Sequence, residues 1–389
     1  MWTEALPAPA HLGEGSRQRP GSRPTVAEVD LGAIAHNLEC VRRVAAPAQV
    51  YAVVKADAYG HGLIPVARCL EDHGVDGICV ALVEEGLSLR AAQVEVPILV
   101  LNGVYGCDHA EVLRAGLTPV IYELGQAQAF GRAAEGRPVR VHLKVDTGMA
   151  RLGVQMHELP RMLAGLAELP TLRIDGLMTH LSSADTDPEI TAQQLARFSE
   201  VEAAVRAAGH NPRFIHAANS AGTYTSNPGT HHNLVRVGLA LYGVPPLSAV
   251  GLDLRPAMRV SSQIVALRDL PADAPVGYGA TVRTARPTRV ATVAIGYGDG
   301  LLRAASNRGR MLVRGLSAPI VGVVAMDLTC LDVTDVPSAR VGDEVVVLGR
   351  QAGAEISARD LAEASGTIPY EVITNLSARV PRVYRAAGG

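Results

Sequence analysis

From residue 50 to about residue 239 the sequence repeats one pattern: a short apolar run, a polar loop and an amphipathic helical segment. Short apolar runs that alternate with helices predict βαβ units and a parallel sheet. The eight runs are residues 50–54, 78–82, 98–101, 118–121, 139–145, 172–178, 213–217 and 234–237, of which the last two are weak. Eight such units favour a (β/α)8 barrel over an open sheet.

A change of composition near residues 243–256 (GVPPLSAVGLDLRP) predicts a domain boundary. Helical spacing largely disappears after it, and we expect strands at residues 258–270, 289–295, 310–313, 318–323, 328–333 and 344–348. One helix is predicted at 357–365, with Ser357 as its N-cap and Asp360 three residues later. A chain of 389 residues favours two domains, and the second is expected to be mostly β.

The start of the chain reads as a tail. Residues 1–24 are rich in Pro, Gly, Ser and Arg and lack the apolar core of a signal peptide. Residues 25–31 then alternate like a strand, and residues 32–45 have helical spacing. The expected organisation is a disordered tail at 1–24, a barrel at 25–250 and a mostly-β domain at 251–389.

Bulk properties exclude several classes of function. The formal net charge of −2 gives no basic surface for nucleic acid, and no apolar run is long enough to span a membrane. The five cysteines follow neither metal-ligand nor disulfide spacing. That usage favours a reducing cytoplasm and no metal site.

Polar residues follow the apolar runs of the barrel, where such folds assemble their active sites. They are Lys55, Asn102, Lys144 with Asp146, His180, Asn219 with Ser220, and Arg236. One or two could be chance, but a set after nearly every strand is poorly explained by a purely structural barrel. A strand-end lysine such as Lys55 is partly desolvated, which lowers its pKa and makes its amine a usable nucleophile for a Schiff base.

Each of these residues also has a structural interpretation. Arg151 could hold a carboxylate with two parallel hydrogen bonds, or it could pair with Asp146 at the strand end. A lone histidine such as His180 is more often structural than catalytic, and Arg236 could form an ion pair at the barrel end. Single residues leave these alternatives open.

Longer strings narrow the interpretation. They are YAVVKADAYGHG (51–62), HLKVDTGMARLG (142–153), GLMTHLSSAD (176–185), HAANSA (216–221), VRVGLALYG (235–243), VGYGAT (276–281), AIGYGDG (294–300), VVAMD (323–327) and IPYEVITNLSARVPR (368–382). Together they resemble the alanine racemases, pyridoxal-phosphate enzymes of fold type III. The resemblance covers about residues 25–385 in the family's order, and it supports the count of eight barrel strands.

The resemblance implies a pyridoxal 5'-phosphate site in the barrel. Its lysine is Lys55, and the phosphate ligands are Tyr59, Tyr370, Asn219, Ser220 and the backbone at Gly238 and Leu239. Arg151 matches the residue near the cofactor's phenolic oxygen and the substrate carboxylate. His180 packs beside the pyridine ring as a supporting residue, and Arg236 meets the pyridine nitrogen. A guanidinium does not give up its proton, so the ring is a weaker electron sink. Lys144 matches a lysine that is carbamylated in some members.

The second domain carries the remaining residues that the resemblance implies. Tyr278 matches a second catalytic base that reaches the site from a partner subunit, and Tyr297 matches a residue of the substrate entrance. Met326 matches a residue whose backbone amide contacts the substrate carboxylate. The chain departs from the family's pattern at Ala150 (usually Gly), Ala325 (usually Cys) and Ala378 (often Tyr), none of which is a proposed proton-transfer group.

These features predict a cytoplasmic homodimer with shared active sites that interconverts L-alanine and D-alanine, the latter for peptidoglycan, by a two-base mechanism. A broad-spectrum racemase acting on serine or lysine is the main alternative, because selectivity depends on packing at the entrance. A decarboxylase of this fold class usually places a carboxylate at the pyridine nitrogen, which Arg236 disfavours. A non-catalytic pyridoxal-phosphate barrel protein would lack the β-rich domain.

Overall fold

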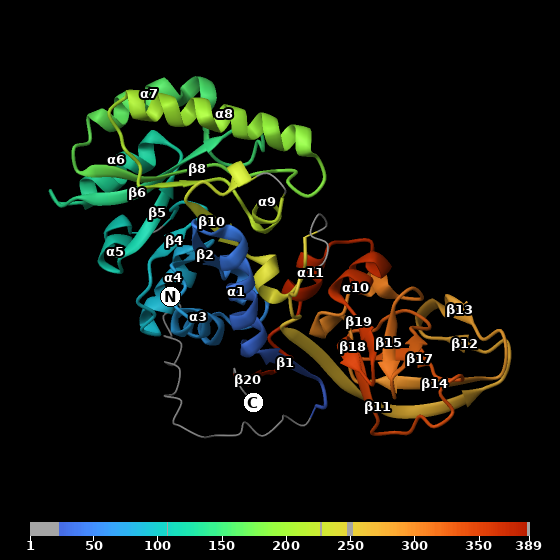
Figure 1. Cartoon of the computed structure of the whole chain (residues 1–389). Coiled ribbons are helices and arrows are strands. Elements are labelled where there is room, and N and C mark those ends of the chain that lie inside the picture. Colours follow the sequence, from blue (N-terminus) through green and yellow to red (C-terminus); the bar gives the residue numbers. More distant parts are fainter. Residues whose placement is uncertain (1–22, 107, 226–227, 247–251, 387–389) are drawn as a thin grey trace.

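The computed structural model describes residues 23–106, 108–225, 228–246 and 252–386. They form two bodies, a barrel of parallel strands surrounded by helices and a β-rich domain beside it (Figure 1). No helix in these residues has both the length and the apolar character needed to cross a membrane.

The barrel contains eight parallel strands in the order β10-β2-β3-β4-β5-β6-β8-β9. They are β2 (Gln49–Val53), β3 (Gly77–Val80), β4 (Ile98–Val100), β5 (Leu117–Ile121), β6 (Val139–Asp146), β8 (Leu172–Met178), β9 (Phe214–His216) and β10 (Leu234–Val237), with the short β7 (Val154–Gln155) beside β6. The amide N–H of Arg236 donates to the Ala218 carbonyl at 3.0 Å, which nearly closes the barrel between β9 and β10. All eight predicted barrel strands are confirmed.

Helices cover the outside of the barrel. They are α1 (Leu31–Ala45), α3 (Leu63–Asp72), α4 (Val83–Ala91), α5 (His109–Arg114), α6 (Leu124–Ala133), α7 (Leu159–Ala167) and α8 (Pro188–Ala207), while the short α2 (Lys55–Tyr59) and α9 (Ser220–Thr223) lie in loops at the strand ends. Every residue of β3 and β4 is buried, as expected for parallel strands covered on both faces.

The second body, the β-domain, is built on the long strand β11 (Met258–Leu270). Its other strands are β12 (Pro275–Val276), β13 (Val282–Arg283), β14 (Thr288–Val293), β15 (Arg310–Val313), β16 (Leu316–Pro319), β17 (Thr329–Asp332), β18 (Glu344–Gln351), β19 (Ala354–Ile356) and β20 (Arg382–Arg385), and its helices are α10 (Ala358–Ser365) and α11 (Pro369–Thr374). Short 3-10 turns occur at η1 (Met156–Glu158), η2 (Pro228–Thr230), η3 (Leu239–Tyr242), η4 (Tyr278–Ala280), η5 (Tyr297–Asp299) and η6 (Arg303–Ala305).

Most of the predicted β-domain elements occur as expected. The N-cap of α10 is Ser357, whose hydroxyl accepts from the Asp360 amide while the Asp360 carboxylate accepts from the Ser357 amide. The strand expected at 318–323 was placed too late, because β16 ends at Pro319 and Ile320 makes only an isolated bridge to Leu331. The strand β20 and the helix α11 were not predicted.

The first strand lies outside the barrel, in contrast to the expected range of 25–250. Strand β1 (Val26–Asp30) pairs antiparallel with β11 and parallel with β20 in the β-domain sheet. Its residues alternate between buried and partly exposed, and this pattern suits a sheet with one exposed face better than a buried barrel. The placement of the domain boundary near residue 250 stays a prediction.

The predicted tail falls mostly outside the described residues. Arg23 and Pro24 are described, however, and the Arg23 guanidinium contacts the Asp299 carboxylate at 2.6 Å. The tail therefore does not extend to residue 24 as predicted, because Arg23 is already anchored to the β-domain.

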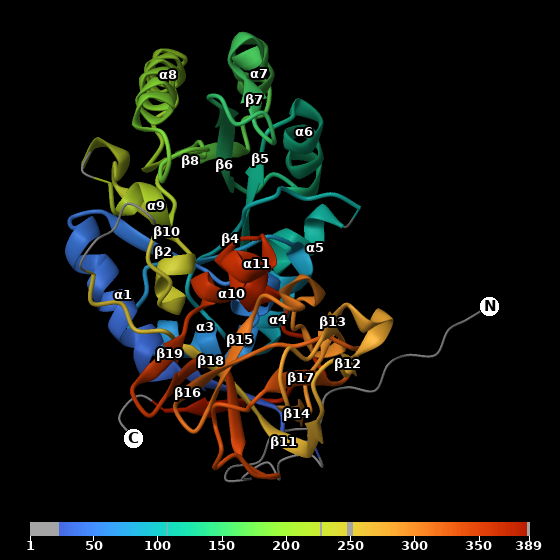
Figure 2. The same cartoon turned by 90° about the vertical axis from the view of Figure 1, so that its right-hand side faces the viewer.

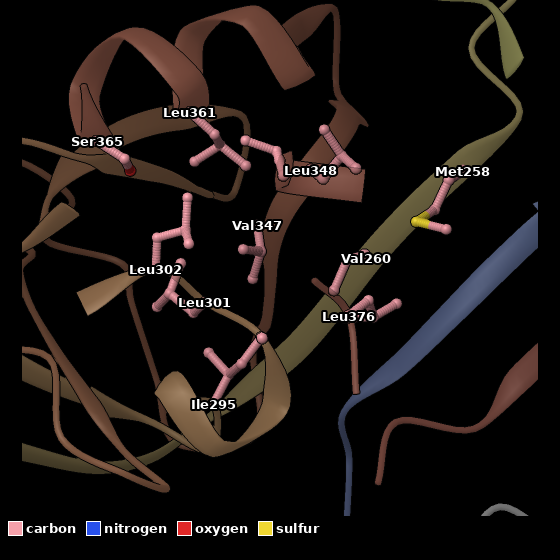
Figure 3. Close-up of a pocket in the computed structure, with 12 residues that line it drawn as sticks. Met258, Val260, Ile295, Leu301, Leu302, Val347, Leu348, Leu361, Ser365 and Leu376 are labelled. Atoms are coloured by element: carbon pink, nitrogen blue, oxygen red, sulfur yellow. The ribbon is translucent and has the colours of Figure 1, made fainter. Parts of the chain in front are cut away.

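A small apolar cavity of about 40 Å³ lies between α10 and the β-domain sheet. Leu361 of α10 faces Leu301, Leu302, Val347 and Leu348 around it (Figure 3). Both views of the whole chain show α10 and α11 near the junction with the barrel (Figure 1 and Figure 2). The packing of these helices therefore affects how the β-domain meets the barrel.

The first prediction concerns this packing. Leu361→Ala should lower the thermal midpoint of unfolding, because truncating a buried leucine costs about 2–5 kcal/mol and here enlarges an existing cavity. Leu316→Ala is the matched control, since Leu316 is 51% exposed on β16. Similar shifts for the two variants in differential scanning calorimetry would contradict this account of the core.

Candidate active site

A cavity of about 590 Å³ opens at the carboxyl ends of the barrel strands. Most of the residues singled out from the sequence line it, namely Lys55, Tyr59, Asn102, Lys144, Arg151, His180, Asn219, Ser220, Arg236, Gly238, Leu239 and Tyr370. These residues come from segments that are far apart in the chain, and the fold brings their side chains into one cavity.

The turn after Lys55 has an unusual backbone. Ala56, Asp57, Ala58 and Tyr59 all have φ between 53° and 55°, which makes one left-handed turn without glycine. Each such residue costs roughly 1–2 kcal/mol. The turn is therefore stable only because its surroundings hold it.

Hydrogen bonds from three side chains hold this turn. The Glu85 carboxylate accepts from the Ala56 amide at 2.7 Å, and the Asp57 carboxylate accepts from the Leu63 amide at 2.7 Å. The buried ring of His61 contacts two carbonyl oxygens of the turn through Nδ1, at 3.0 and 3.1 Å. Because carbonyls only accept, Nδ1 of His61 carries the proton.

The β-domain holds the same turn from the other side. Arg382 Nε donates to the Gly60 carbonyl at 3.1 Å. A Cβ at Gly60 would lie 2.3 Å from the Ile373 carbonyl oxygen of α11, and one at Gly62 would lie 1.9 Å from the Tyr384 hydroxyl. Both glycines are therefore needed where the two bodies meet.

Two lysines of the cavity have lowered pKa values. Burial, and then the charge of Arg151, lower the pKa of Lys55. Burial, Arg236 and Arg151 lower the pKa of Lys144 to about 8. Both amines are therefore easier to deprotonate than an exposed lysine, which suits a base or nucleophile.

Arg236 lies at the centre of a buried polar network. Its NH1 contacts Nδ1 of His216 at 2.6 Å, and Nε2 of His216 contacts Nδ1 of His142 at 2.9 Å. Its NH2 donates to the Thr179 carbonyl at 2.8 Å and contacts Nδ1 of His180 at 3.3 Å. A guanidinium only donates, so Nδ1 of both His216 and His180 must accept.

The histidines of this network are neutral. Burial and the Arg236 charge lower the pKa of His142 to about 3 and the pKa values of His180 and His216 well below 6.5. Burial lowers the pKa of Arg236 to about 10, so this side chain remains charged near neutrality. No carboxylate contacts Arg236 among the described residues, and the alternative of a barrel-end ion pair is not realised.

One end of the cavity is a cradle of hydroxyl groups and backbone amides. Ser220 Oγ accepts from the Gly238 and Ala240 amides at 3.0 and 3.4 Å, which leaves its proton free to face the cavity. A Cβ at Gly238 would lie 2.4 Å from the Tyr59 hydroxyl, so only glycine fits there. Burial raises the pKa values of Tyr59 and Tyr370, and both phenols therefore remain hydrogen-bond donors.

Asn219 and Asp146 support the cavity by bonding to the backbone. Asn219 caps α9 by accepting from the Gly222 amide at 2.9 Å and donates to the Leu181 carbonyl. Asp146 accepts from the Gly148 and Met149 amides at 2.9 and 2.8 Å. Among the described residues no ion pair joins Arg151 to Asp146, so the alternative of a strand-end salt bridge is not realised.

Three predicted residues lie away from this cavity. Tyr278, Met326 and Tyr297 are 73%, 52% and 40% exposed on the β-domain, and none of them lines the cavity of its own chain. Tyr297 and Met326 are neighbours, since the Tyr297 amide donates to the Ala325 carbonyl at 3.0 Å and the Gly298 amide donates to the Met326 carbonyl at 2.8 Å.

Several residues that shape the site were not predicted. Met149, Met178, Leu181, Ile368 and Thr374 line the cavity without a sequence signal. The first three are apolar residues at or after barrel strands, which are common, and the last two lie at the ends of α11, which was not predicted. The role of Arg382 depends on a contact between the two bodies, and that of His61 depends on hydrogen bonds to the backbone of its own turn. His142 and His216 stood in the quoted strings, but their link appears only when β6 and β9 close into the barrel.

Comparisons with known proteins agree over both bodies. Residues 29–246 match the family "Alanine racemase, N-terminal domain", and residues 257–384 match "Alanine racemase, C-terminal domain". A protein named alanine racemase from Sorangium cellulosum is 48% identical over 377 residues, which are 93% of this chain and 99% of that protein.

Solved structures show the same similarity. The alanine racemase of D-cycloserine-producing Streptomyces lavendulae has a TM-score of 0.90 at 36% identity, over 95% of this chain and 98% of that one. The alanine racemase of Bartonella henselae, described with covalently bound pyridoxal phosphate, has a TM-score of 0.86 at 31% identity, over 93% and 99% of the two chains.

The second prediction tests the turn beside Lys55. Gly60→Ala should lower both the thermal midpoint and the affinity for pyridoxal phosphate, because the new methyl group meets the Ile373 carbonyl. Gly74→Ala is the control: Gly74 also has positive φ, at 69°, but its nearest neighbour would be a flexible arginine nitrogen at 3.6 Å. Titration of the apo forms with the cofactor measures the difference, and equal affinities would argue against a role of this contact.

Proposed function

We propose, from the premise that this chain belongs to the alanine racemase family, that its barrel cavity holds pyridoxal phosphate on Lys55 and performs racemisation with two bases. Membership of the family makes the chain a pyridoxal-phosphate-dependent isomerase that interconverts L-alanine and D-alanine. The observation that carries the residue assignments is the single cavity that joins Lys55, Arg236 and the hydroxyl cradle.

The residues fit the cofactor at three points. Lys55 would hold the aldehyde carbon, the cradle of Tyr59, Ser220 and Gly238 would hold the phosphate, and Arg236 would face the ring nitrogen. Such a cradle suits a phosphate dianion, because small residues let backbone amides come close to the phosphate and hydroxyl groups donate hydrogen bonds to its oxygens. When bound, the cofactor withdraws electrons and makes the substrate's Cα proton acidic.

Arg236 is suited to a limited form of this chemistry. Within the described residues its hydrogen bonds use NH1 and NH2, and none uses Nε, which can therefore donate to a ring nitrogen. A guanidinium donates a hydrogen bond without transferring its proton. The neutral His216 and His180 rings, which accept from Arg236, keep its orientation fixed.

Racemisation requires a base on each face of the substrate. Lys55 is one candidate, because its lowered pKa makes its amine easier to deprotonate than that of an exposed lysine. Tyr278 of the partner subunit is the other, since the chain's own Tyr278 lies exposed and outside its own cavity. The cationic surroundings that would favour a phenolate come from Arg151 and Arg236 and not from His180, whose pKa is lowered.

A homodimer would bring these groups together. Tyr278, Tyr297, Met326 and Leu328 are exposed on loops of the β-domain. Exposed apolar side chains gathered on one region favour an interaction surface. A two-fold axis would place this region of each chain at the cavity of the other.

We further propose that the enzyme acts in the cytoplasm, where its product supplies peptidoglycan synthesis, since the four described cysteines are free.

Lys144 is a candidate for carbamylation. Its side chain is buried with a pKa of about 8 and lies near the positive charges of Arg236 and Arg151. A neutral amine adds carbon dioxide to give a carbamate and one released proton, which exchanges a cation for an anion. That anion would pair with Arg151 and hold it in place.

The third prediction tests the cofactor lysine. Lys55→Ala should abolish racemisation and the absorbance of lysine-bound cofactor while the circular dichroism of the fold is retained. A chiral assay against L-alanine, L-serine and L-lysine, run in parallel on the unaltered protein, separates an alanine-selective enzyme from a broad-spectrum racemase. Undiminished turnover by the variant without added amines would rule out Lys55 as the catalytic lysine.

The fourth prediction tests the second base. Tyr278→Phe should slow proton abstraction from L-alanine far more than abstraction from D-alanine, because the phenol serves only one face. Deuterium exchange at Cα, measured separately from each enantiomer, reports the two faces. Equal losses for both enantiomers would count against separate bases.

The fifth prediction tests the shared site. Mixing inactive Lys55→Ala and Tyr278→Ala chains should restore activity, because each hybrid dimer contains one site with both groups intact. With random exchange half of the dimers are hybrids, so roughly a quarter of the activity should return, by the closed two-fold symmetry of such dimers. No recovery after verified subunit exchange would place both groups within one chain.

A further inference from the structure

A buried carboxylate lies inside the turn that carries Tyr297. Asp299 belongs to η5 (Tyr297–Asp299), and its side chain is fully buried. Its Oδ2 accepts from the Gly296 amide at 3.0 Å, which closes the turn on itself. An ionised carboxylate removed from water requires a cation to balance it.

Arg23, the first described residue, supplies this cation. NH1 donates to Asp299 Oδ1 at 2.6 Å, NH2 donates to Oδ2 at 2.8 Å, and NH2 also donates to the Ala294 carbonyl at 2.9 Å. Two parallel hydrogen bonds fix the orientation of both groups, which a lysine cannot do. The Arg23 side chain is only 35% exposed, so this pair is more protected from water than a surface salt bridge.

A second arginine connects Asp299 to the neighbouring loop. Arg379 lies 3.5 Å from Asp299 Oδ1, and its NH2 contacts Asp327 Oδ1 at 2.6 Å. Asp327 directly follows Met326. The cluster therefore holds two carboxylates and two arginines, and it binds the loop of Tyr297 to the loop of Met326.

Two further hydrogen bonds connect these loops to each other and to the segment before β20. Ser377 Oγ donates to the Gly298 carbonyl, and the Gly298 amide donates to the Met326 carbonyl. Among the residues that the structure describes, Arg379 would be the only cation paired with Asp299 and Asp327 if Arg23 were removed. The negative charge of the buried Asp299 carboxylate would then be only partly neutralised, and the turn would open toward water because water can solvate this charge.

We propose that Arg23, which precedes β1, is a positioning residue of the racemase. Through its two hydrogen bonds to Asp299, Arg23 fixes Tyr297 and Met326 at the substrate entrance of the partner subunit's active site. This inference rests on the proposed function, in which those two residues face the cavity of the other chain. It assigns a catalytic consequence to a residue outside both the barrel and the β-domain sheet.

The expected kinetic effect falls on substrate capture. Arg23→Ala should raise the KM for alanine on the order of tenfold, comparable to the loss of one charge-assisted hydrogen bond from a binding step. The absorbance of the lysine-bound cofactor should not change, because none of the hydrogen bonds and ion pairs of the four cluster residues reaches Lys55 or its turn directly. Arg23→Lys should recover part of the loss, since it restores the charge without the two-pronged geometry.

Two further variants separate positioning from general stability. Arg385→Ala is the matched control, because Arg385 pairs with Glu28 in the same sheet without touching the turn. Asp299→Asn should raise KM as well, and the double variant with Arg23→Ala should be little worse than either single variant. An unchanged KM in Arg23→Ala, or an equal rise in Arg385→Ala, would overturn the proposal.

The closing experiment places Arg23→Ala in only one chain of the hybrid between Lys55→Ala and Tyr278→Ala subunits. In that hybrid the intact site takes Lys55 from the Tyr278→Ala chain and the Tyr278 loop from the Lys55→Ala chain. We expect a raised KM when Arg23→Ala is in the Lys55→Ala chain and an unchanged KM when it is in the other.

The outcomes are distinguishable. Equal effects in both placements, or no effect in either, would overturn the role of Arg23 while leaving the shared site intact. A hybrid without activity even when Arg23 is present would instead remove the proposed function on which this inference rests.

Discussion

The left-handed turn after Lys55 is the constraint on which the rest of the site depends. Four consecutive L-residues with positive φ are unfavourable in isolation, so the turn exists only while both bodies hold it. The barrel contributes Glu85 and His61, and the β-domain contributes Arg382 and the backbone of Ile373. This left-handed turn presents the Lys55 amine and the Tyr59 hydroxyl to the same cavity. Assembly of the two bodies and assembly of the site are therefore one event.

The side chains that face the cavity make it positively charged. Lys55, Lys144, Arg151 and Arg236 face it, whereas the carboxylate of Asp146 turns to backbone amides. The neutral histidines around Arg236 add donors and acceptors without adding charge. Such a cavity has a positive potential and favours anions. A phosphate and a substrate carboxylate are suitable ligands, and their negative charges would relieve the repulsion among the cations.

The sequence predicted the parts of the structure that depend on local pattern. Buried parallel strands such as β3 and β4 read as continuous apolar runs, and Ser357 with Asp360 marked the start of α10. Contacts between distant segments were not predictable in the same way. Ala and Tyr have no preference for a left-handed turn, and a single Asp does not indicate four such residues in a row. The sequence of β1 predicts a strand whichever sheet it joins. Arg23 lies 276 residues from Asp299, so in the sequence it is only one arginine in a segment rich in Pro and Gly.

A single chain has no suitable second base among the described residues that line its cavity. Burial raises the pKa values of Tyr59 and Tyr370, and both phenols belong to the hydroxyl cradle, where they remain hydrogen-bond donors. Nδ1 of His180 already accepts from Arg236, and the lowered pKa of the ring makes it a weak base. Lys144 is the candidate for carbamylation, and a carbamylated lysine would have no free amine to act as a base. A phenol supplied by another subunit would enter the cationic cavity without belonging to its hydroxyl cradle or to the network of Arg236. The exposure of Tyr278 on a loop between two glycines is therefore what a base supplied to another subunit requires.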